Sequence, residues 1–526
     1  MKAYKYFITA TLALMLLGGC QDYNELVKNP NLPSSAPPSL LLTGVLNSMS
    51  SDNAWDGFSG PMSSNQFWIS TYTYYGTNNF DQYPFIGGSF DYLTLQNVVQ
   101  MEIEAARLGA PDPNPYSALG KFFRAYYFNL MSQKMGDLPM SEALKGAANT
   151  APVYDTQHDI YVQILKWLDD ANTELGAMVA SPGSVSLPLA GDIYLGNDLA
   201  KWQKLVNAYT LRVLVSLSKK DTDATLGVPA KFAAIVNNPT NYPLMTGLGD
   251  NMQYVYNAQF NIYPKNPGNI GFNISRENVA STFLGLTTSL NDPRTFVTST
   301  PAPAQLAAGK LFSDQAAYVG APAGEDMSVL GTLAQNGDYS YVNGLRYYTT
   351  YDGSNAEPAI IVGYPEMCFN IAEGINRGWA AGSAGTWYTN GIQAAMAHLG
   401  VTEGGSVTVA DFHLTPYGSV TTSISAYLAQ ASVAYLGDNS AGLNQILTQK
   451  YLAFWQNSGW EAFFNQRRTG VPAFSTGAGT GNGGVIPQRW QYPYGELTAN
   501  KVNYDASVQR QFSGSDDLNG VLWINQ

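Results

Sequence analysis

The side chains best suited to bind a ligand are aromatic rings that gather in two segments rich in glycine, asparagine and threonine. A flat ring can stack on the C–H face of a sugar, and nearby amides can bond its hydroxyl groups. Large rings also bury much area in a core, and the residues leave both interpretations open. The candidates for ligand binding are Trp55, Trp68, Tyr72, Tyr75, Trp490 and Tyr492.

Signatures of a catalytic nucleophile are absent from the sequence. It contains no G-x-S-x-G elbow and no H-E-x-x-H helix. Cys368 falls in a helical pattern, which favours a buried structural thiol. We therefore predict no catalytic residue, although the paired carboxylates of a glycoside hydrolase are a spatial feature that sequence leaves open.

The sequence assigns no metal site. Its three histidines, His158, His398 and His413, are too far apart for the ligand spacing of a zinc site. Calcium takes oxygen ligands only, so the many Asp and Asn residues leave a structural calcium open. We expect no other cofactor.

The N-terminus predicts export and lipid attachment. Lys2 and Lys5 precede a short apolar run, and small residues lead directly into Cys20. This order is typical of a lipoprotein signal at residues 1–19, with the lipid on the Cys20 thiol. Residues 20–38, with four prolines, are expected to form a flexible tether. No later apolar run is long enough to cross a bilayer, so the lipid would be the anchor.

The composition disfavours nucleic acid as a partner. The formal net charge is −12, whereas phosphate binding needs clustered Lys and Arg. Charged residues make up only 13% of the chain and aromatic residues another 13%. Such a polar, weakly charged and ring-rich surface suits neutral, hydroxyl-bearing ligands, although exported proteins also carry it for solubility.

Hydrophobic periodicity predicts a mainly helical protein with one domain over residues 39–526 and irregular insertions near 54–92 and 240–363. Long loops in compact domains are usually functional. Strands are expected only at short stretches such as 252–256 and 339–351. The expected helices are 39–46 capped by Ser39, 95–108, 116–135, 155–178 capped by Asp155, 198–217, 365–379, 386–399, 424–435, 443–455 and 460–467.

Short fragments in a fixed order along nearly the whole chain resemble the SusD/RagB family of outer-membrane nutrient-binding lipoproteins of Bacteroidetes, in particular its SusD-like, starch-associated branch. The fragments are Asn29-Pro30-Asn31, Pro38-Ser39-Leu40-Leu41-Leu42, Gly136-Asp137-Leu138-Pro139, Ser141-Glu142-Ala143-Leu144, Tyr154-Asp155-Thr156-Gln157, Asp198-Leu199-Ala200-Lys201-Trp202, Leu211-Arg212, Asn291-Asp292-Pro293-Arg294, Tyr364-Pro365-Glu366, Ile371-Ala372-Glu373, Trp455, Arg467-Arg468-Thr469-Gly470, Ile486-Pro487-Gln488-Arg489 and Tyr492-Pro493.

The resemblance implies a right-handed scaffold of tetratricopeptide-like helix pairs, with a large loop-rich portion and a few short strands. It implies a non-catalytic lipoprotein on the cell exterior that captures oligosaccharides and hands them to a SusC-like TonB-dependent transporter. Some family members take peptides instead, so a peptide ligand is the first alternative. A surface glycoside hydrolase is the second, and a structural or adhesive protein without a small ligand is the third.

Overall fold

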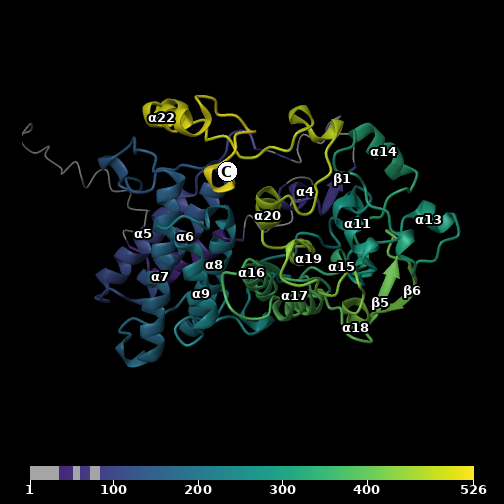
Figure 1. Cartoon of the computed structure of the whole chain (residues 1–526), viewed down its shortest axis with the longest axis horizontal. Coiled ribbons are helices and arrows are strands. Elements are labelled where there is room, and N and C mark those ends of the chain that lie inside the picture. The colour runs from purple at the N-terminus through teal and green to yellow at the C-terminus, as the bar shows by residue number, and fades with distance from the viewer. Residues whose placement is uncertain (1–34, 51–59, 72–82, 84) are drawn as a thin grey trace, which may run out of the picture.

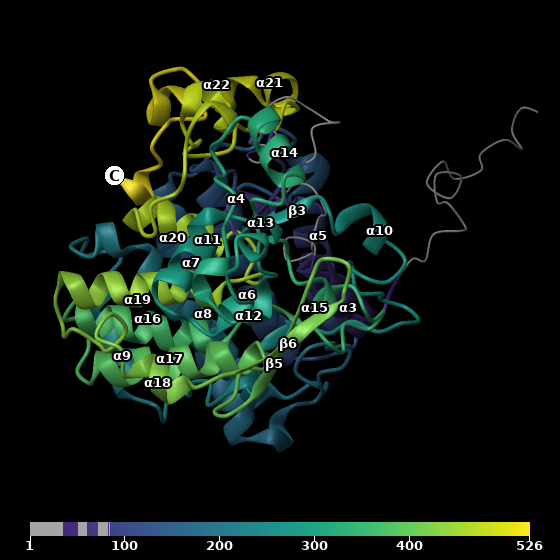
Figure 2. The same cartoon turned by 90° about the vertical axis from the view of Figure 1, so that its right-hand side faces the viewer.

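The computed structural model describes residues 35–50, 60–71, 83 and 85–526, and it is mainly helical. One side of the molecule is a stack of long helices, and the other carries short helices and strands joined by loops (Figures 1 and 2). This arrangement confirms the predicted tetratricopeptide-like helix pairs with a loop-rich portion. Within the described residues, no helix is both long enough and apolar enough to cross a membrane.

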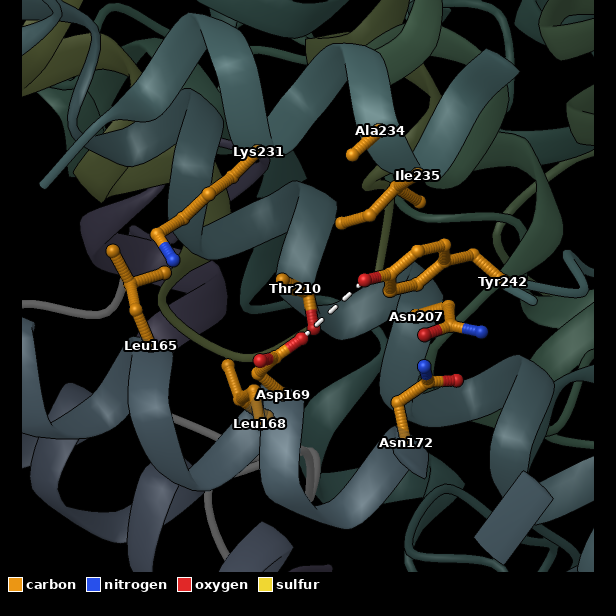
Figure 3. A pocket seen from close by; sticks show the side chains of 10 residues that line it. All are labelled: Leu165, Leu168, Asp169, Asn172, Asn207, Thr210, Lys231, Ala234, Ile235 and Tyr242. Carbon is orange, nitrogen blue, oxygen red and sulfur yellow. Dashed lines mark hydrogen bonds between the residues drawn. The ribbon is translucent and has the colours of Figure 1, made fainter. Parts of the chain in front are cut away.

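We call the helical side the helical half. Successive helices pack on one another, and α8 also packs on α16, which in turn holds α17 and α19. The helical half consists of α3 (Pro38–Ser48), α5 (Tyr92–Arg107), α6 (Pro115–Met135), α7 (Gln157–Ala180), α8 (Leu199–Ser216), α9 (Val228–Asn237), α16 (Tyr364–Asn376), α17 (Ala384–His398), α19 (Ser440–Ala453) and α20 (Glu461–Thr469). Figure 3 shows α7, α8 and α9 around a cavity that the loop after α9 partly covers with Tyr242.

Local sequence explains where the long helices begin and end. Asn114 accepts hydrogen bonds from the first backbone amides of α6, Pro115 follows at the first helical position, and Gly136 ends the helix with a φ of 96°. Asp198 caps α8. The predicted Ser39 cap of α3 is wrong, because that helix already begins at Pro38. The predicted Asp155 cap of α7 is wrong, because Thr156 caps that helix. Asp155 instead accepts hydrogen bonds from the amides of Met140 and Ser141, each at 2.8 Å.

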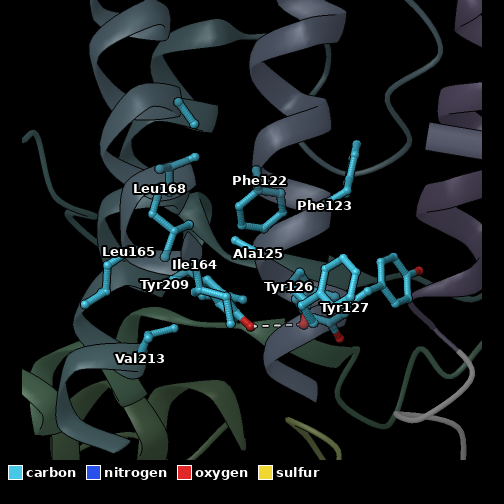
Figure 4. Packing of buried hydrophobic residues seen from close by; sticks show 14 of the residues in the cluster. Phe122, Phe123, Ala125, Tyr126, Tyr127, Ile164, Leu165, Leu168, Tyr209 and Val213 are labelled. Atoms are coloured by element: carbon cyan, nitrogen blue, oxygen red, sulfur yellow. Dashed lines mark hydrogen bonds between the residues drawn. The ribbon is translucent and has the colours of Figure 1, made fainter. Parts of the chain in front are cut away.

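Rings and aliphatic side chains from neighbouring helices interlock in the core of the helical half (Figure 4). Phe122 of α6 lies edge-on to Tyr209 of α8, with ring centroids 5.5 Å apart. The Tyr209 hydroxyl donates to the backbone oxygen of Tyr126 at 3.5 Å. These residues recur at helical spacing, so the helices can be predicted from the sequence.

We call residues 60–71, 263–357 and 400–437 the loop half. Its own buried core includes Phe67, Trp68 and Phe283, and it packs on α16, α17 and α19. The loop half contains α4 (Pro61–Ser64), β1 (Trp68–Ser70), α10 (Ile270–Asn273), β3 (Glu277–Val279), α11 (Ser281–Ser289), α12 (Arg294–Thr298), α13 (Pro303–Ala307), α14 (Met327–Gln335), α15 (Gly344–Tyr347), β5 (Ser406–Ala410), β6 (Pro416–Thr421) and α18 (Ile424–Leu428).

The strands of the described residues form three antiparallel pairs. β1 pairs with β3, with Trp68 opposite Val279, and β5 pairs with β6 as a hairpin. β2 (Met252–Tyr254), which the sequence predicted, pairs with β4 (Ala359–Val362) at the join of the two halves. At the C-terminus, α21 (Glu496–Ala499) and α22 (Lys501–Phe512) lie against the helical half, where Arg510 of α22 donates to Asp137 at 2.8 Å.

Two expectations for the loop half are wrong. Residues 339–351 form only isolated bridges at Tyr341 and Val342, followed by the short helix α15. The helix expected over 424–435 ends at Leu428, and hydrogen-bonded turns follow it. In both places short-range apolar spacing suggested a regular element, but contacts to distant segments set the backbone.

Candidate functional site

Three of the six candidate binding rings are buried, so their burial favours packing over ligand binding. The Trp68 ring faces the Lys265 ammonium, 5.0 Å from the ring centroid, inside the loop-half core. The Trp490 ring stacks on Phe85 with centroids 3.5 Å apart, and the Tyr492 hydroxyl donates to the backbone oxygen of Asp137 at 2.8 Å. The other three candidates, Trp55, Tyr72 and Tyr75, lie outside the described residues.

Cys368 matches its predicted structural role. It is fully buried in α16, and burial raises the pKa of its thiol to about 12. A thiol that stays protonated at ordinary pH is a poor nucleophile. Cys20, the predicted lipid site, lies outside the described residues.

The loop half contains a cavity of about 350 Å³, which we call the loop-half pocket. Its walls come from the segment after β1, the segment before β3, the helix α14 and the segment after it. The lining residues are Thr71, Ser275, Arg276, Gly331, Ala334, Gln335 and Tyr341. This lining combines a cation, an amide, hydroxyls and one aromatic ring.

The β1–β3 pair holds one wall of the loop-half pocket in place. The ladder continues beyond Ser70, because the Thr71 amide donates to the backbone oxygen of Arg276 at 3.0 Å. The Thr71 hydroxyl donates to Oδ1 of Asn278 at 2.7 Å. Both bonds involve buried or half-buried groups, so they fix the backbone from which the Arg276 side chain extends.

The opposite wall is built by α14 and Tyr341. Asp326 caps α14 by accepting from the Ser328 amide at 2.8 Å. The Tyr341 hydroxyl donates to the backbone oxygen of Ala334 at 3.2 Å, and its ring lies 4.6 Å from that of Phe412. Burial raises the pKa of Tyr341, so the phenol stays neutral and keeps this bond.

The charged side chain in the described lining of the loop-half pocket is Arg276. No carboxylate occurs among the described residues that line it, whereas glycoside hydrolysis needs a pair of carboxyl groups. Glu277 is next to Arg276 in sequence but is fully buried, pairs with Lys265 and accepts from the Tyr348 hydroxyl at 2.8 Å. The guanidinium, amide and hydroxyls can instead bond the oxygens of a polar ligand.

Four of the short sequence fragments meet in buried ion pairs. Arg212 donates to Glu366 at 2.7 Å, so the fragment Leu211-Arg212 meets Tyr364-Pro365-Glu366. Arg468 donates to both oxygens of Glu373 at 2.6 and 3.0 Å. Because these ion pairs are buried, the fragments that contain them indicate the fold and not the ligand.

Sequence reasoning missed the individual residues of the loop-half pocket. Thr71 lies in the first irregular insertion, and Arg276, Gln335 and Tyr341 lie in the second. The length of these insertions was the available signal, since long loops tend to carry function. No local pattern marks the four positions, because they meet only through the fold.

Residues 30–493 match a SusD-like family described as starch-binding and associating with the outer membrane. A search of curated proteins found no match. Among solved structures, a SusD homologue from Bacteroides fragilis is 29% identical, with a TM-score of 0.79 and coverage of 93% of this chain and 100% of that one. A putative outer-membrane protein from Bacteroides vulgatus, described as probably involved in nutrient binding, is 30% identical, with a TM-score of 0.75 and coverage of 93% and 100%.

A chitin-binding SusD homologue from Flavobacterium johnsoniae is 18% identical and shows the same fold, with a TM-score of 0.68 and coverage of 93% of this chain and 98% of that one. The family match covers most of the chain, and the fold agrees with it over nearly the full length. The protein therefore belongs to the SusD-like family of outer-membrane-associated nutrient-binding proteins.

Proposed function

We propose that this protein is a non-catalytic cell-surface lipoprotein that captures oligosaccharides at the loop-half pocket. The match of residues 30–493 with a starch-binding family carries the proposal. The pocket supports it, because its described lining offers hydrogen-bonding groups and a ring but no carboxylate. A neutral glycan presents many hydroxyls to such groups and needs no opposite charge for binding.

We further propose that the captured glycan passes to a SusC-like TonB-dependent transporter, while the lipid on Cys20 keeps the protein at the outer membrane. The family description supports the membrane association. The lipoprotein signal before Cys20 supports the anchor. A lipid with a tether holds a protein near a membrane without restricting its orientation, as capture and delivery require.

Calorimetric titration tests the ligand class. Starch and chitin oligosaccharides of increasing length are titrated into the purified full chain, with a mixed peptide library as the comparison. Chitin is included because a relative of the same fold is described as chitin-binding. Saturable glycan binding is expected, without release of shorter products on long incubation. Peptide binding without glycan binding would overturn the proposal in favour of a peptide-binding protein, and product release would favour a glycoside hydrolase.

The anchor is tested by fractionating cells that express Cys20→Ala. The variant is expected to leave the membrane fraction, because the thiol that takes the lipid is gone. Cys368→Ala is the matched control, since this thiol is buried and the variant should stay in the membrane fraction. If Cys20→Ala stays with membranes, the proposed anchor is wrong.

Affinity purification from membranes tests the partner. The full chain should retain a TonB-dependent barrel of the SusC type through washing. Retention of no barrel would contradict the delivery step and would favour a structural or adhesive role.

A further inference from the structure

The helical half contains a separate cavity of about 170 Å³, which we call the helical cavity (Figure 3). It shares no lining residue with the loop-half pocket. Its walls come from α7, α8, α9 and the loop that follows α9. The lining residues are Leu165, Leu168, Asp169, Asn172, Asn207, Thr210, Lys231, Ala234, Ile235 and Tyr242.

One wall of the helical cavity is aliphatic and another is aromatic. Leu165 and Leu168 come from α7 and Ile235 from α9, while Tyr242 closes the side between them (Figure 3). The Tyr242 hydroxyl donates to Oδ1 of Asp169 at 3.4 Å. Burial, and secondarily the Asp169 charge, raise the pKa of Tyr242, so the phenol keeps its proton at ordinary pH.

Two buried amides hold the loop after α9 against the helices. Asn172 donates to the backbone oxygen of Asn241 at 3.2 Å, and Asn207 donates to that of Pro243 at 3.0 Å. Oδ1 of Asn172 is occupied by Gln203, which donates to it at 3.0 Å. Among the described residues, nothing donates to Oδ1 of Asn207, although this side chain is only 1% exposed. Oδ1 of Asn207 can therefore accept a hydrogen bond from a ligand in the cavity.

The two charges of the helical cavity are opposite in sign, so they give a singly charged ligand no net attraction. Asp169 and Lys231 are both exposed at the cavity, and they form no ion pair with each other in the part of the chain that the structure describes. An anion would meet the Asp169 carboxylate, and a cation would meet the Lys231 ammonium. Both side chains can still hydrogen-bond a neutral ligand, one as acceptor and one as donor.

The size of the helical cavity matches one six-membered ring. An apolar cavity of roughly 150 Å³ in another protein takes a benzene molecule, so about 170 Å³ has room for one pyranose. A pyranose presents C–H faces to aliphatic or aromatic walls and hydroxyls to polar groups around its edge.

We propose that the helical cavity is a second binding site, which takes a single neutral monosaccharide unit through Asp169, Asn207, Lys231 and the ring of Tyr242. The inference goes beyond the proposed function, because it holds whether the loop-half pocket takes a glycan or a peptide. It gives the scaffold helices a recognition role in addition to support.

Saturation-transfer-difference NMR on the full chain tests the site with a panel of glucose, galactose, mannose, xylose and N-acetylglucosamine, and with leucine as the zwitterionic comparison. At least one sugar should bind saturably, on the order of millimolar, as expected for so small a ligand. Ala234→Trp should abolish that binding, because Ala234 is exposed and a large ring there fills the cavity without disturbing the core.

Matched variants separate the helical cavity from the loop-half pocket. Asp169→Ala should weaken sugar binding at least about tenfold, as expected for losing a charge-assisted hydrogen bond. Asp170→Ala is the control on the same helix, because Asp170 pairs with Lys166 at 2.6 Å and does not line the cavity. Gln335→Ala, in the loop-half pocket, should leave this binding unchanged.

Three outcomes would overturn the inference. The first is that no sugar of the panel binds, and the second is that leucine binds in place of sugars. The third is a sugar signal that survives Ala234→Trp in a folded protein but disappears with Gln335→Ala. That last pattern would assign the binding to the loop-half pocket and leave the proposed function standing.

Discussion

The helical half and the loop half both enclose buried cores, but different interactions hold them. In the helical half, elements that touch usually follow one another in the chain, and side chains recur at helical spacing. In the loop half, single bonds join remote segments. The Thr71 hydroxyl donates to Oδ1 of Asn278 at 2.7 Å, and the Thr282 hydroxyl donates to Oε1 of Gln66 at 2.5 Å. The comparison shows that local sequence patterns build the helical half, whereas long-range contacts build the loop half, where we propose that the ligand binds.

Charged groups serve two purposes in this protein, and the loop half contains both, since Glu277 and Lys265 form a buried pair there. Glu373 is fully buried in the helical half and pairs with Arg468 and Arg377. In the loop half, Arg276 lines an open cavity. A buried ion pair costs much to break, whereas an ion pair on the exposed surface costs little.

The largest expected effect on stability comes from breaking the buried ion pair between Glu373 and Arg468 in the helical half. Glu373→Gln removes the charge opposite Arg468 and should lower the free energy of unfolding by about 3–5 kcal/mol. Asp505→Asn is the control, because Asp505 pairs with Lys501 on the exposed face of α22, and its loss should cost about 1 kcal/mol or less. Urea unfolding measures both. Equal losses of stability in the two variants would contradict the distinction between buried and exposed ion pairs.

Paired truncations compare the packing of the two cores. Phe122→Ala in the helical half and Phe283→Ala in the loop half should each lower the free energy of unfolding by about 3–5 kcal/mol. Phe122 is fully buried, as is Phe283, which lies 4.3 Å from the Trp455 ring. Thermal unfolding by circular dichroism measures the losses. A loss below about 1 kcal/mol for Phe283→Ala alone would mean that the loop half is loosely packed.

Lowering the pH should destabilise the fold by protonating Glu373 in the helical half. Burial tends to raise the pKa of this carboxyl, but Arg468 and then Lys450 and Arg377 outweigh it and hold the pKa at about 2, below the ordinary 4.5. The folded protein therefore favours the ionised form. Its contribution is complete above about pH 4.5 and is lost as the pH falls towards 2. Unfolding midpoints measured between about pH 4.5 and 2 should decrease as the pH is lowered. The decrease should be smaller in Glu373→Gln than in the unaltered protein. An unchanged slope in that variant would assign the acid sensitivity elsewhere.

The smallest expected effect on stability is in the loop-half pocket. Tyr341→Phe removes the hydrogen bond to Ala334 and should cost about 1 kcal/mol, because the ring contact with Phe412 stays. Tyr318→Phe is a comparison in the same half, since its hydroxyl donates to the backbone oxygen of Phe312 at 2.9 Å, away from the pocket. Both should lose similar stability, and only Tyr341→Phe should weaken ligand binding. Equal binding by both variants would exclude Tyr341 from the site.

The long helices of the helical half were largely predictable from the sequence. The apolar spacing of α6 and α8, the stop at Gly136 and the cap at Asp198 are local signals, and the structure follows them. Helix α9 was missed because it has only 10 residues and begins with Val228 and Pro229 after a glycine. The β5–β6 hairpin was missed because its strands alternate weakly between buried and exposed positions.

The loop-half pocket was not predictable residue by residue. Thr71 and Arg276 are 205 positions apart and meet only because β1 pairs with β3. The aromatic rings that did stand out, Trp68 and Trp490, are buried, since large rings are as useful in a core as on a binding surface. None of the candidate rings is among the described residues that line the loop-half pocket, so the ring clusters did not identify these groups.

Calorimetric titration of Gln335→Ala with the best-binding oligosaccharide tests the central claim most directly. Gln335 is an exposed residue of α14 that lines the loop-half pocket, and neighbouring Asn336 is exposed but does not line it, so Asn336→Ala is the matched control. We predict that Gln335→Ala weakens binding by roughly tenfold with an unchanged unfolding midpoint, while Asn336→Ala binds as the unaltered protein does. Unaltered affinity in Gln335→Ala, and likewise in Arg276→Met, would contradict the claim that the loop-half pocket holds the glycan.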